Sequence, residues 1–209
     1  MTKTSRTDFV DTWLAEMPSG LGSFETYDAL EYSIKDLLKN KANKQQVSQD
    51  FFKIDLNSSV YYWFEKNNQI LLGVQLDKQP QGLVVSLTGK NPVKQGMPPY
   101  ASDMYALILK DNDKNIRILS DTQLSDEGYN IWKTLLSKGF KVSVYDRAEP
   151  GKTFQTFDTI DQMNNYFQDD DTDYERYQFV LSEQKNIAEC RSFFNTRRYR
   201  ELAGLSLED

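Results

Sequence analysis

Residue types that carry most enzyme chemistry are scarce in this chain of 209 residues. It contains no histidine, and Cys190 is its single cysteine. Serine–histidine–aspartate triads, cysteine–histidine dyads and zinc sites with imidazole ligands are therefore excluded within this sequence. A lone cysteine also excludes a disulfide within the chain and fits a reducing compartment. The missing histidine limits the candidate functions more sharply than any other feature of the sequence.

Two clusters of charged residues are candidates for binding ions or partners. The acidic run at residues 169–173 has the charge of a calcium loop but lacks the glycine and the final glutamate at the required offsets. We therefore interpret it as a solvated turn. Arg197, Arg198 and Arg200 surround Tyr199 and could clamp a phosphate or an acidic partner surface, although a charged helix face is the commoner arrangement.

The composition indicates a folded, acidic protein. Apolar residues make up 39% of the chain, and 12 Phe, 12 Tyr and three Trp offer large surfaces for one core. A net charge of −6 disfavours direct binding to nucleic acid, which requires Lys and Arg gathered on one face. The sequence shows no apolar run of membrane-spanning length and no signal peptide. We therefore expect a cytoplasmic protein that does not bind membranes.

The elements that must position any site are clearest in the middle of the chain. A β-branched strand at 116–119 should end at Ser120, a residue that favours turns and helix caps. Ser125 is placed to cap a helix that ends at Gly139, and an alternating strand follows at 140–145. Strand, helix and strand within about thirty residues have the size of a βαβ unit.

Periodicity and turn signals predict the remaining elements. Helices are expected at 7–17, 27–38, 101–110, 159–167 and 187–202, with a solvated polar tract at 39–49 and a loop rich in Gly and Pro at 89–99. Strands are expected at 51–56, 60–64, 69–76, 83–88 and 177–181. The predicted fold is α/β (α+β), with a mixed sheet in which an antiparallel meander precedes the strand–helix–strand unit and helices flank the sheet. In this prediction, residues 1–150 form the core of the domain with its amino-terminal helices, and residues 151–209 add a strand and a helix packed on the same domain.

This order of elements resembles the GNAT superfamily of acyltransferases, in a variant associated with phages and mobile elements, over residues 60–146. In the family, a glycine-containing loop after the fourth strand binds the pyrophosphate of coenzyme A at the start of the next helix. The resemblance implies acetyl-CoA as cofactor and assigns this loop to Lys94, Gln95, Gly96 and Met97. The two prolines that follow lack backbone amides, which departs from the family pattern. The strands on either side of this helix splay apart in the family and admit the pantetheine arm.

The next helix carries the second point of resemblance. Family members place Asn, Ala and Tyr along it, where this chain has Ser125, Gly128 and Trp132. Ser125 is thereby implied at the cofactor. The family tyrosine protonates the leaving thiolate, which an indole cannot do, so the resemblance implies Tyr129 or Tyr105 as the acid instead.

Three functions stay open from the sequence. The first is a non-catalytic or weakly catalytic GNAT-like module, phage-encoded, that binds a protein partner or a second copy of the chain through aromatic residues. The second is an N-acyltransferase (N-acetyltransferase) that uses acetyl-CoA, with Glu65 or Asp103 as a candidate base for the attacking amine. The third is an acidic decoy that occupies a nucleic-acid-binding protein, which rests on net charge alone.

Overall fold

The structure is a computed structural model that describes residues 23–112, 116–122, 124–148, 155–167 and 176–182. Its helices are α2 (Ser23–Lys39), α3 (Ala101–Asp111), α4 (Asp126–Ser137) and α5 (Ile160–Asn164), with a 3-10 turn η1 (Pro92–Lys94). Its strands are β1 (Lys44–Ser48), β2 (Phe51–Asp55), β3 (Ser59–Lys66), β4 (Gln69–Gln79), β5 (Gly82–Lys90), β6 (Ile118–Leu119), β7 (Lys141–Asp146), β8 (Gln155–Thr156) and β9 (Tyr177–Ser182). The helices predicted at 7–17 and 187–202, the acidic run, Cys190 and the arginine cluster lie outside the described residues.

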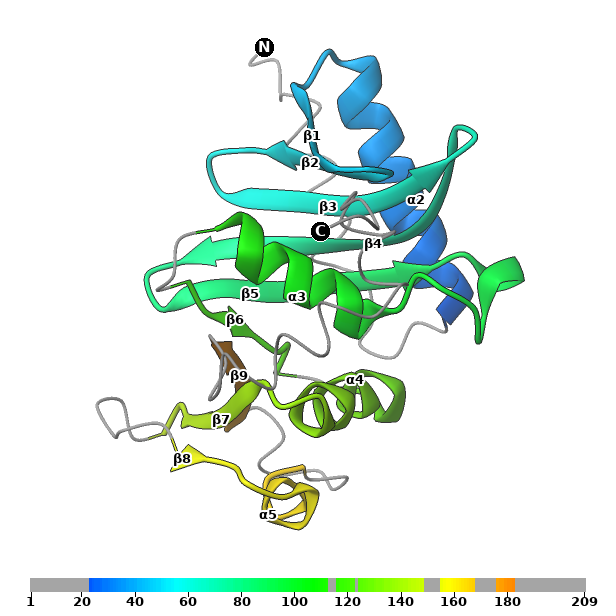
Figure 1. Cartoon of the computed structure of the whole chain (residues 1–209). Coiled ribbons are helices and arrows are strands. Elements are labelled where there is room, and N and C mark those ends of the chain that lie inside the picture. Colours follow the sequence, from blue (N-terminus) through cyan, green and yellow to red (C-terminus); the bar gives the residue numbers. More distant parts are fainter. Residues whose placement is uncertain (1–22, 113–115, 123, 149–154, 168–175, 183–209) are drawn as a thin grey trace, which may run out of the picture.

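The strands form one open sheet in the order β1-β2-β3-β4-β5-β6-β9-β7-β8 (Figure 1). Neighbouring strands are antiparallel except β5 and β6, which run parallel. The predicted meander is present, and in the turn between β3 and β4 Asn67 and Asn68 have positive φ angles of 50° and 64°, as a type I′ turn requires. The predicted α+β class with a mixed sheet is confirmed.

The predicted βαβ unit is wrong in one respect. β6, α4 and β7 follow each other as expected, and the Ser125 hydroxyl caps α4 by accepting a hydrogen bond of 3.2 Å from the Gly128 amide. However, β9 lies between β6 and β7 and pairs antiparallel with both. Phe179, Val180 and Leu181 of β9 are all buried, so β9 is covered on both faces of the sheet and paired on both edges, as an inner strand is.

The prediction of a solvated tract at 39–49 is also wrong, because β1 lies within it. None of the five residues of β1 is buried, so hydrophobic periodicity gives no signal for this strand. Lys44 instead attaches β1 to its neighbours. Its ammonium group lies 4.0 Å from the centroid of the Phe52 ring and 2.8 Å from a carboxylate oxygen of Glu65.

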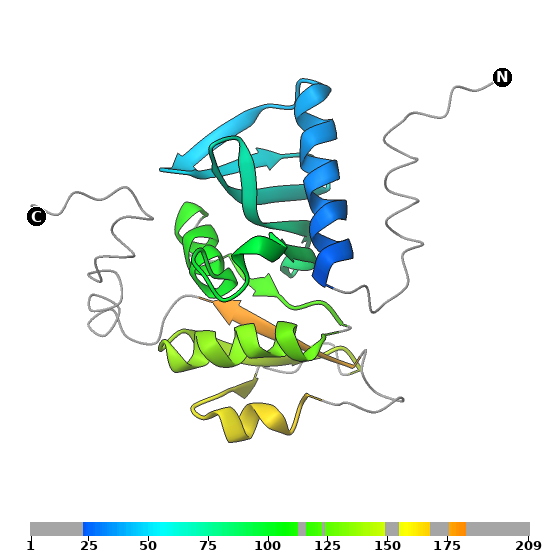
Figure 2. The same cartoon turned by 90° about the vertical axis from the view of Figure 1, so that its right-hand side faces the viewer.

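Helices cover both faces of the sheet (Figure 2). On one face, Tyr27 of α2 belongs to a buried cluster with Trp63 of β3. On the other face, Tyr105 of α3 and Trp132 of α4 belong to the main core. A Cβ on Gly89 would lie 2.7 Å from the Tyr27 Cα, so a glycine is required where β5 approaches α2.

The apolar periodicity of the sequence predicts ten core positions, and eight of them are buried in the structure. Leu87 and Ile131 are only half-buried, whereas the others are buried: Leu72, Val74, Val85, Leu107, Leu119, Leu135, Val142 and Val144. Among the described residues, no helix combines the length and the apolar character needed to cross a membrane.

Candidate functional site

β5 and β6 separate after two paired residues. Leu83 pairs with Ile118 and Val84 with Leu119, while β5 continues to Lys90 and β6 ends. In Figure 1, β6 slants away from β5 toward β9. The last paired residues are Val84 on β5 and Leu119 on β6, and we call the point where the two strands separate the β5–β6 divergence. In the part of the chain that the structure describes, the second half of β5 therefore has a ladder partner only on its β4 side.

A β-bulge lies on β5 next to the divergence. Leu76 of β4 pairs with Val85 and Gln75 pairs with Leu87, so Ser86 is the extra residue on β5. A bulge bends its strand, increases the local twist and often lies next to an active site. The bulge at Ser86 therefore marks this part of β5 as a candidate site.

The Ser86 hydroxyl is buried and has no hydrogen-bond partner, alone among the buried side-chain nitrogen and oxygen atoms of the described residues. Leaving a buried hydroxyl unpaired costs about 1–3 kcal/mol, and native proteins keep few such groups. A ligand that brings a hydrogen-bonding group to this point would satisfy it. Ser86 was not predicted from the sequence, where it is the single polar residue inside the apolar run at 83–87.

Tyr105, one of the two predicted acids, lies over β5 beyond the bulge. Its hydroxyl shares a hydrogen bond of 3.0 Å with the Thr88 hydroxyl. Tyr105 is 2% exposed, and this burial raises the pKa of its hydroxyl to about 12, outweighing the opposite effect of Thr88. Tyr105 is therefore protonated at neutral pH, as a proton donor must be.

The predicted cofactor loop joins β5 to α3, and hydrogen bonds hold it at both ends. The Asn91 side chain accepts a hydrogen bond of 3.0 Å from the Val93 amide and donates one of 3.1 Å to the Tyr27 hydroxyl. At the other end, the Tyr100 hydroxyl donates a bond of 2.9 Å to the Gly96 carbonyl. Gly96 has a φ of 71°, and no atom lies within 4 Å of the position that its Cβ would take. The backbone of this exposed glycine is thus open to a close approach.

The other residues of this loop differ in exposure. Lys94 ends η1 and is half-buried, whereas Gln95 and Met97 are exposed. Lys90, the last residue of β5, donates a hydrogen bond to the Met97 carbonyl, and its ammonium group lies 4.8 Å from the centroid of the Tyr100 ring. Two lysines therefore belong to the segment around Gly96.

The first turn of α3 is tied to the end of α4. The Lys138 ammonium group donates a hydrogen bond of 2.8 Å to the Ser102 hydroxyl and lies 2.7 Å from the Asp103 carboxylate. Tyr100, the N-cap of α3, makes no side-chain capping bond. A buried carboxylate thus already lies at the positive end of the α3 dipole, and Lys138 balances its charge.

The predicted residues of α4 lie away from this loop. Tyr129 donates a hydrogen bond of 2.7 Å to the Asn164 side chain and stacks on Phe167, and burial raises its pKa to about 12. Ser125 caps the end of α4 opposite to Lys138, about 20 Å away at the rise of an α-helix. The structure therefore does not bring Ser125 to the predicted cofactor loop, because the length of α4 separates them.

Trp132 is 1% exposed, and its ring centroid lies 6.2 Å from that of Tyr105. It is a core aromatic residue between α4 and α3. The position that the resemblance assigns to a catalytic tyrosine therefore serves packing in this chain.

Glu65, the predicted base, belongs to the other face of the sheet. It accepts a hydrogen bond of 2.8 Å from the Trp63 indole, which packs with α2, and it forms the ion pair with Lys44. Burial alone would raise the pKa of Glu65, but the hydrogen bonds from Lys44 and Trp63 and the charge of Lys44 hold it below its usual value. The structure does not bring Glu65 together with Tyr105, because the sheet lies between them.

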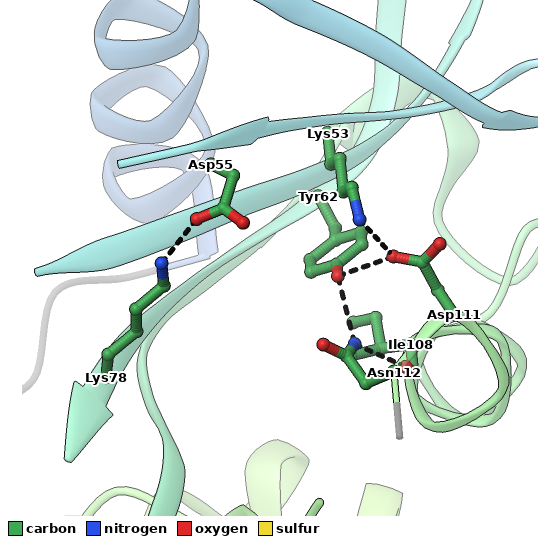
Figure 3. A network of polar contacts seen from close by, with 7 residues as sticks. All are labelled: Lys53, Asp55, Tyr62, Lys78, Ile108, Asp111 and Asn112. Carbon is green, nitrogen blue, oxygen red and sulfur yellow. Dashed lines mark hydrogen bonds and ion pairs between the residues drawn. The ribbon is translucent and has the colours of Figure 1, made fainter. Parts of the chain in front are cut away.

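A polar network fixes the far end of α3 to the sheet (Figure 3). The Asp111 carboxylate lies 2.7 Å from the Lys53 ammonium group and accepts a hydrogen bond of 2.8 Å from the Tyr62 hydroxyl. Asn112 donates to the same hydroxyl over 3.0 Å. Burial raises the pKa of Tyr62 above its usual range. The network therefore positions α3 over β2 and β3.

A cavity of about 540 Å³ lies beside this network, at the turn between β4 and β5. Its lining includes the ion pair between Lys78 and Asp55, and Figure 3 shows this pair next to the Asp111 network. None of the predicted site residues lines it. The cavity is at the start of β5, on the opposite side of the bulge from the predicted cofactor loop.

A search against protein-family models and a search against curated protein sequences each find no match for this chain. The candidate site is therefore defined by the strand pairing, burial and hydrogen bonds described above. It joins the predicted loop and Tyr105 to Ser86 and Thr88 on β5, and it leaves out Glu65, Tyr129 and Ser125.

Proposed function

We propose that the chain binds a coenzyme A thioester along the second half of β5 and transfers its acyl group to an amine, as the resemblance to the GNAT superfamily implies. The observation that carries this proposal is the buried, unpaired Ser86 hydroxyl on a bulge at the β5–β6 divergence. A pantetheine arm is an extended chain with two amide groups. It would pair with the edge of β5 that β6 leaves, and the carbonyl of its thioester would be the hydrogen-bond acceptor for Ser86.

The reaction would proceed by direct attack of the amine on the thioester carbonyl carbon. The carbonyl oxygen would become an oxyanion, and the Ser86 hydroxyl would donate a hydrogen bond to it. The C–S bond would then break, and the leaving thiolate would be protonated to the thiol. Tyr105 is the donor that supports this step, since its pKa of about 12 keeps it protonated and its hydroxyl touches Thr88 on the same strand. The proton of the amine would pass to water, and Tyr105 would regain its proton from solvent.

The pyrophosphate (diphosphate) group of coenzyme A would lie against the loop at Gly96. The open space at this glycine supports a close approach of the anion to the backbone. Lys90 and Lys94 on the same segment favour negative charge there.

Calorimetric titration with acetyl-CoA tests the proposal. In the Ser86→Ala variant, affinity should fall by about 0.5–1.5 kcal/mol, whereas the free protein should become more stable because an unpaired buried hydroxyl is gone. Ser33→Ala is the matched control, since the buried Ser33 hydroxyl already donates a bond of 2.9 Å to Ala29 and lies on α2. This control should lose no affinity. Absence of heat with millimolar acetyl-CoA would reject the thioester function.

A second candidate function is protein binding, which the loop itself favours. Val93 is 78% exposed and Met97 is 53% exposed, on a segment whose ends are fixed by hydrogen bonds. Exposed apolar residues on an ordered loop are typical of contact surfaces, and methionine adapts to varied partners. The same loop would then anchor a partner protein in place of a cofactor.

A double variant, Val93→Ser with Met97→Ser, separates this candidate from the first. A protein partner retained by the wild type should be lost by the double variant and kept by Ile160→Ser, which removes a 37% exposed apolar residue on α5. Retention of the partner by all three proteins would place the interface elsewhere.

A further inference from the structure

β6 ends at Leu119 because side chains replace the next rung of its ladder with β9. The Ser120 amide donates a hydrogen bond of 2.8 Å to the Phe179 carbonyl, as an antiparallel rung requires. The second hydrogen bond of this residue pair does not join two backbone groups. The Phe179 amide donates to the Ser120 hydroxyl over 3.0 Å and not to its carbonyl.

Gln178 binds the Ser120 carbonyl, because the Phe179 amide bonds the Ser120 hydroxyl in its place. Its side-chain amide donates a hydrogen bond of 2.9 Å to the Ser120 carbonyl. Ser120 is 1% exposed and Gln178 is 5% exposed, so both groups are paired inside the protein. The backbone of β6 is thereby bound to β9 by two side-chain bonds, directly after the last residue that pairs with β5.

We propose that Ser120 and Gln178 are positioning residues that determine where β6 leaves β5, and so hold the edge of β5 accessible to the thioester. Continuing the parallel ladder would bring Ser120 opposite Val85, next to the bulge residue Ser86. At that point, the bonds from the Phe179 amide to the Ser120 hydroxyl and from Gln178 to the Ser120 carbonyl hold the Ser120 backbone toward β9. Without these two side-chain bonds, Ser120 and Phe179 would pair through their backbones alone. β6 would then continue beside β5 and cover the edge of β5. This inference rests on the proposed thioester binding and adds residues that touch no part of the ligand.

Two single variants test it, each removing one side-chain bond. Ser120→Ala removes the acceptor for the Phe179 amide, and Gln178→Met removes the donor at nearly constant volume. Ser143→Ala is the matched control, since Ser143 is 3% exposed and pairs with Val180 on the other side of β9. Ser120→Thr keeps the hydroxyl and serves as the rescue.

The readouts are the Kd for acetyl-CoA, measured well below the Tm of each protein, and the Tm itself. We expect the Kd to rise about fivefold in Ser120→Ala and in Gln178→Met, the size of one lost hydrogen bond, and to stay unchanged in Ser143→Ala and Ser120→Thr. A purely structural role would lower the Tm and leave the Kd unchanged, which would overturn the inference. If one variant does not fold, the Kd of the other decides. A wild type that does not bind acetyl-CoA would reject both the thioester function and this inference, whereas a binding wild type with unaffected variants would reject the inference alone.

Discussion

The hydroxyl groups of Thr88 and Tyr105 lie 3.0 Å apart and join β5 to α3 inside the protein. Thr88 follows the bulge residue Ser86 by two positions, so this contact places an ionisable group close to the point where β5 loses its regular ladder. Tyr129 has the same chemistry but contacts α5 and Phe167. The two candidate acids are thus distinguished by what they touch.

Tyr105→Phe should lower the kcat for acyl transfer by about a hundredfold, because the donor for the thiolate is lost. The Kd for acetyl-CoA should stay unchanged. Tyr129→Phe makes the same chemical change and should keep the kcat. Steady-state kinetics with acetyl-CoA and an amine acceptor would check this, and a loss of kcat in Tyr129→Phe alone would assign the acid to α4.

Four buried tyrosines should make the fold sensitive to high pH. Burial raises the pKa of Tyr27, Tyr105 and Tyr129 to about 12 and raises that of Tyr62 as well. An unfolded tyrosine has a pKa of about 10, so the stability from this difference is fully present below about pH 10 and is lost as the pH rises toward 12. Denaturant unfolding across this range should show the fall, with a smaller slope in Tyr105→Phe. A slope unchanged by that substitution would contradict the assignment to buried tyrosines.

Gly96→Glu should weaken acetyl-CoA binding by about 1–3 kcal/mol, because it adds negative charge and bulk where the diphosphate is proposed to lie. Gly96→Ala carries the same backbone strain from the φ of 71° but no charge. Titration of both variants separates charge from strain. Equal binding by wild type and Gly96→Glu would remove the diphosphate from this loop.

Trp132→Ala should destabilise the protein by about 3–5 kcal/mol, since the residue is 1% exposed and its removal leaves a cavity between α3 and α4. Tyr32→Ala, at a residue that is 59% exposed on α2, should change stability by less than about 0.5 kcal/mol. Chemical denaturation measures both. A free energy of unfolding of Trp132→Ala equal to that of the wild type would show that the core tolerates the loss.

Glu65→Gln should affect stability and leave acyl transfer unchanged, because Glu65 pairs with Lys44 and Trp63 on the α2 face. The low pKa of Glu65 stabilises the fold above the unfolded value of about 4.3, and this contribution is lost as the pH falls through the folded pKa. Glu65→Gln should therefore flatten the loss of stability in acid. Thr134→Ala, at an exposed position of α4, is a control that should keep the acid sensitivity. A large loss of kcat in Glu65→Gln would restore the role of a base.

Local signals in the sequence predicted most of the elements, for physical reasons that act over a few residues. Ser120 ends a strand and Ser125 caps a helix in the structure as their side-chain chemistry predicts. β1 escaped prediction because cation–π and ionic contacts of Lys44 hold it, and these depend on residues far along the chain. The place of β9 also depends on long-range pairing that no local pattern encodes.

The candidate site was predictable only in part. The loop at Gly96 follows from Gly and Pro content, and Tyr105 follows from its place in the next helix. Ser86 and Thr88 were missed, because a bulge shifts the alternation of side chains and the sequence does not show where the extra residue lies. Glu65 was grouped with the site although the sheet separates it from Tyr105, since sequence spacing does not report which face a strand residue takes after an irregular rung.

The position of β9 has a consequence for how the protein folds during synthesis. β9 ends at Ser182 and fills the gap between β6 and β7, which are made more than thirty residues earlier. The ribosome therefore releases the β1–β5 meander long before the strand that joins β6 to β7 exists. Until then the inner edges of β6 and β7 stay unpaired, and such edges promote aggregation. The closing step is a non-local pairing, which is intrinsically slow, and a nascent chain that stops before residue 177 would hold a folded meander beside an incomplete second half.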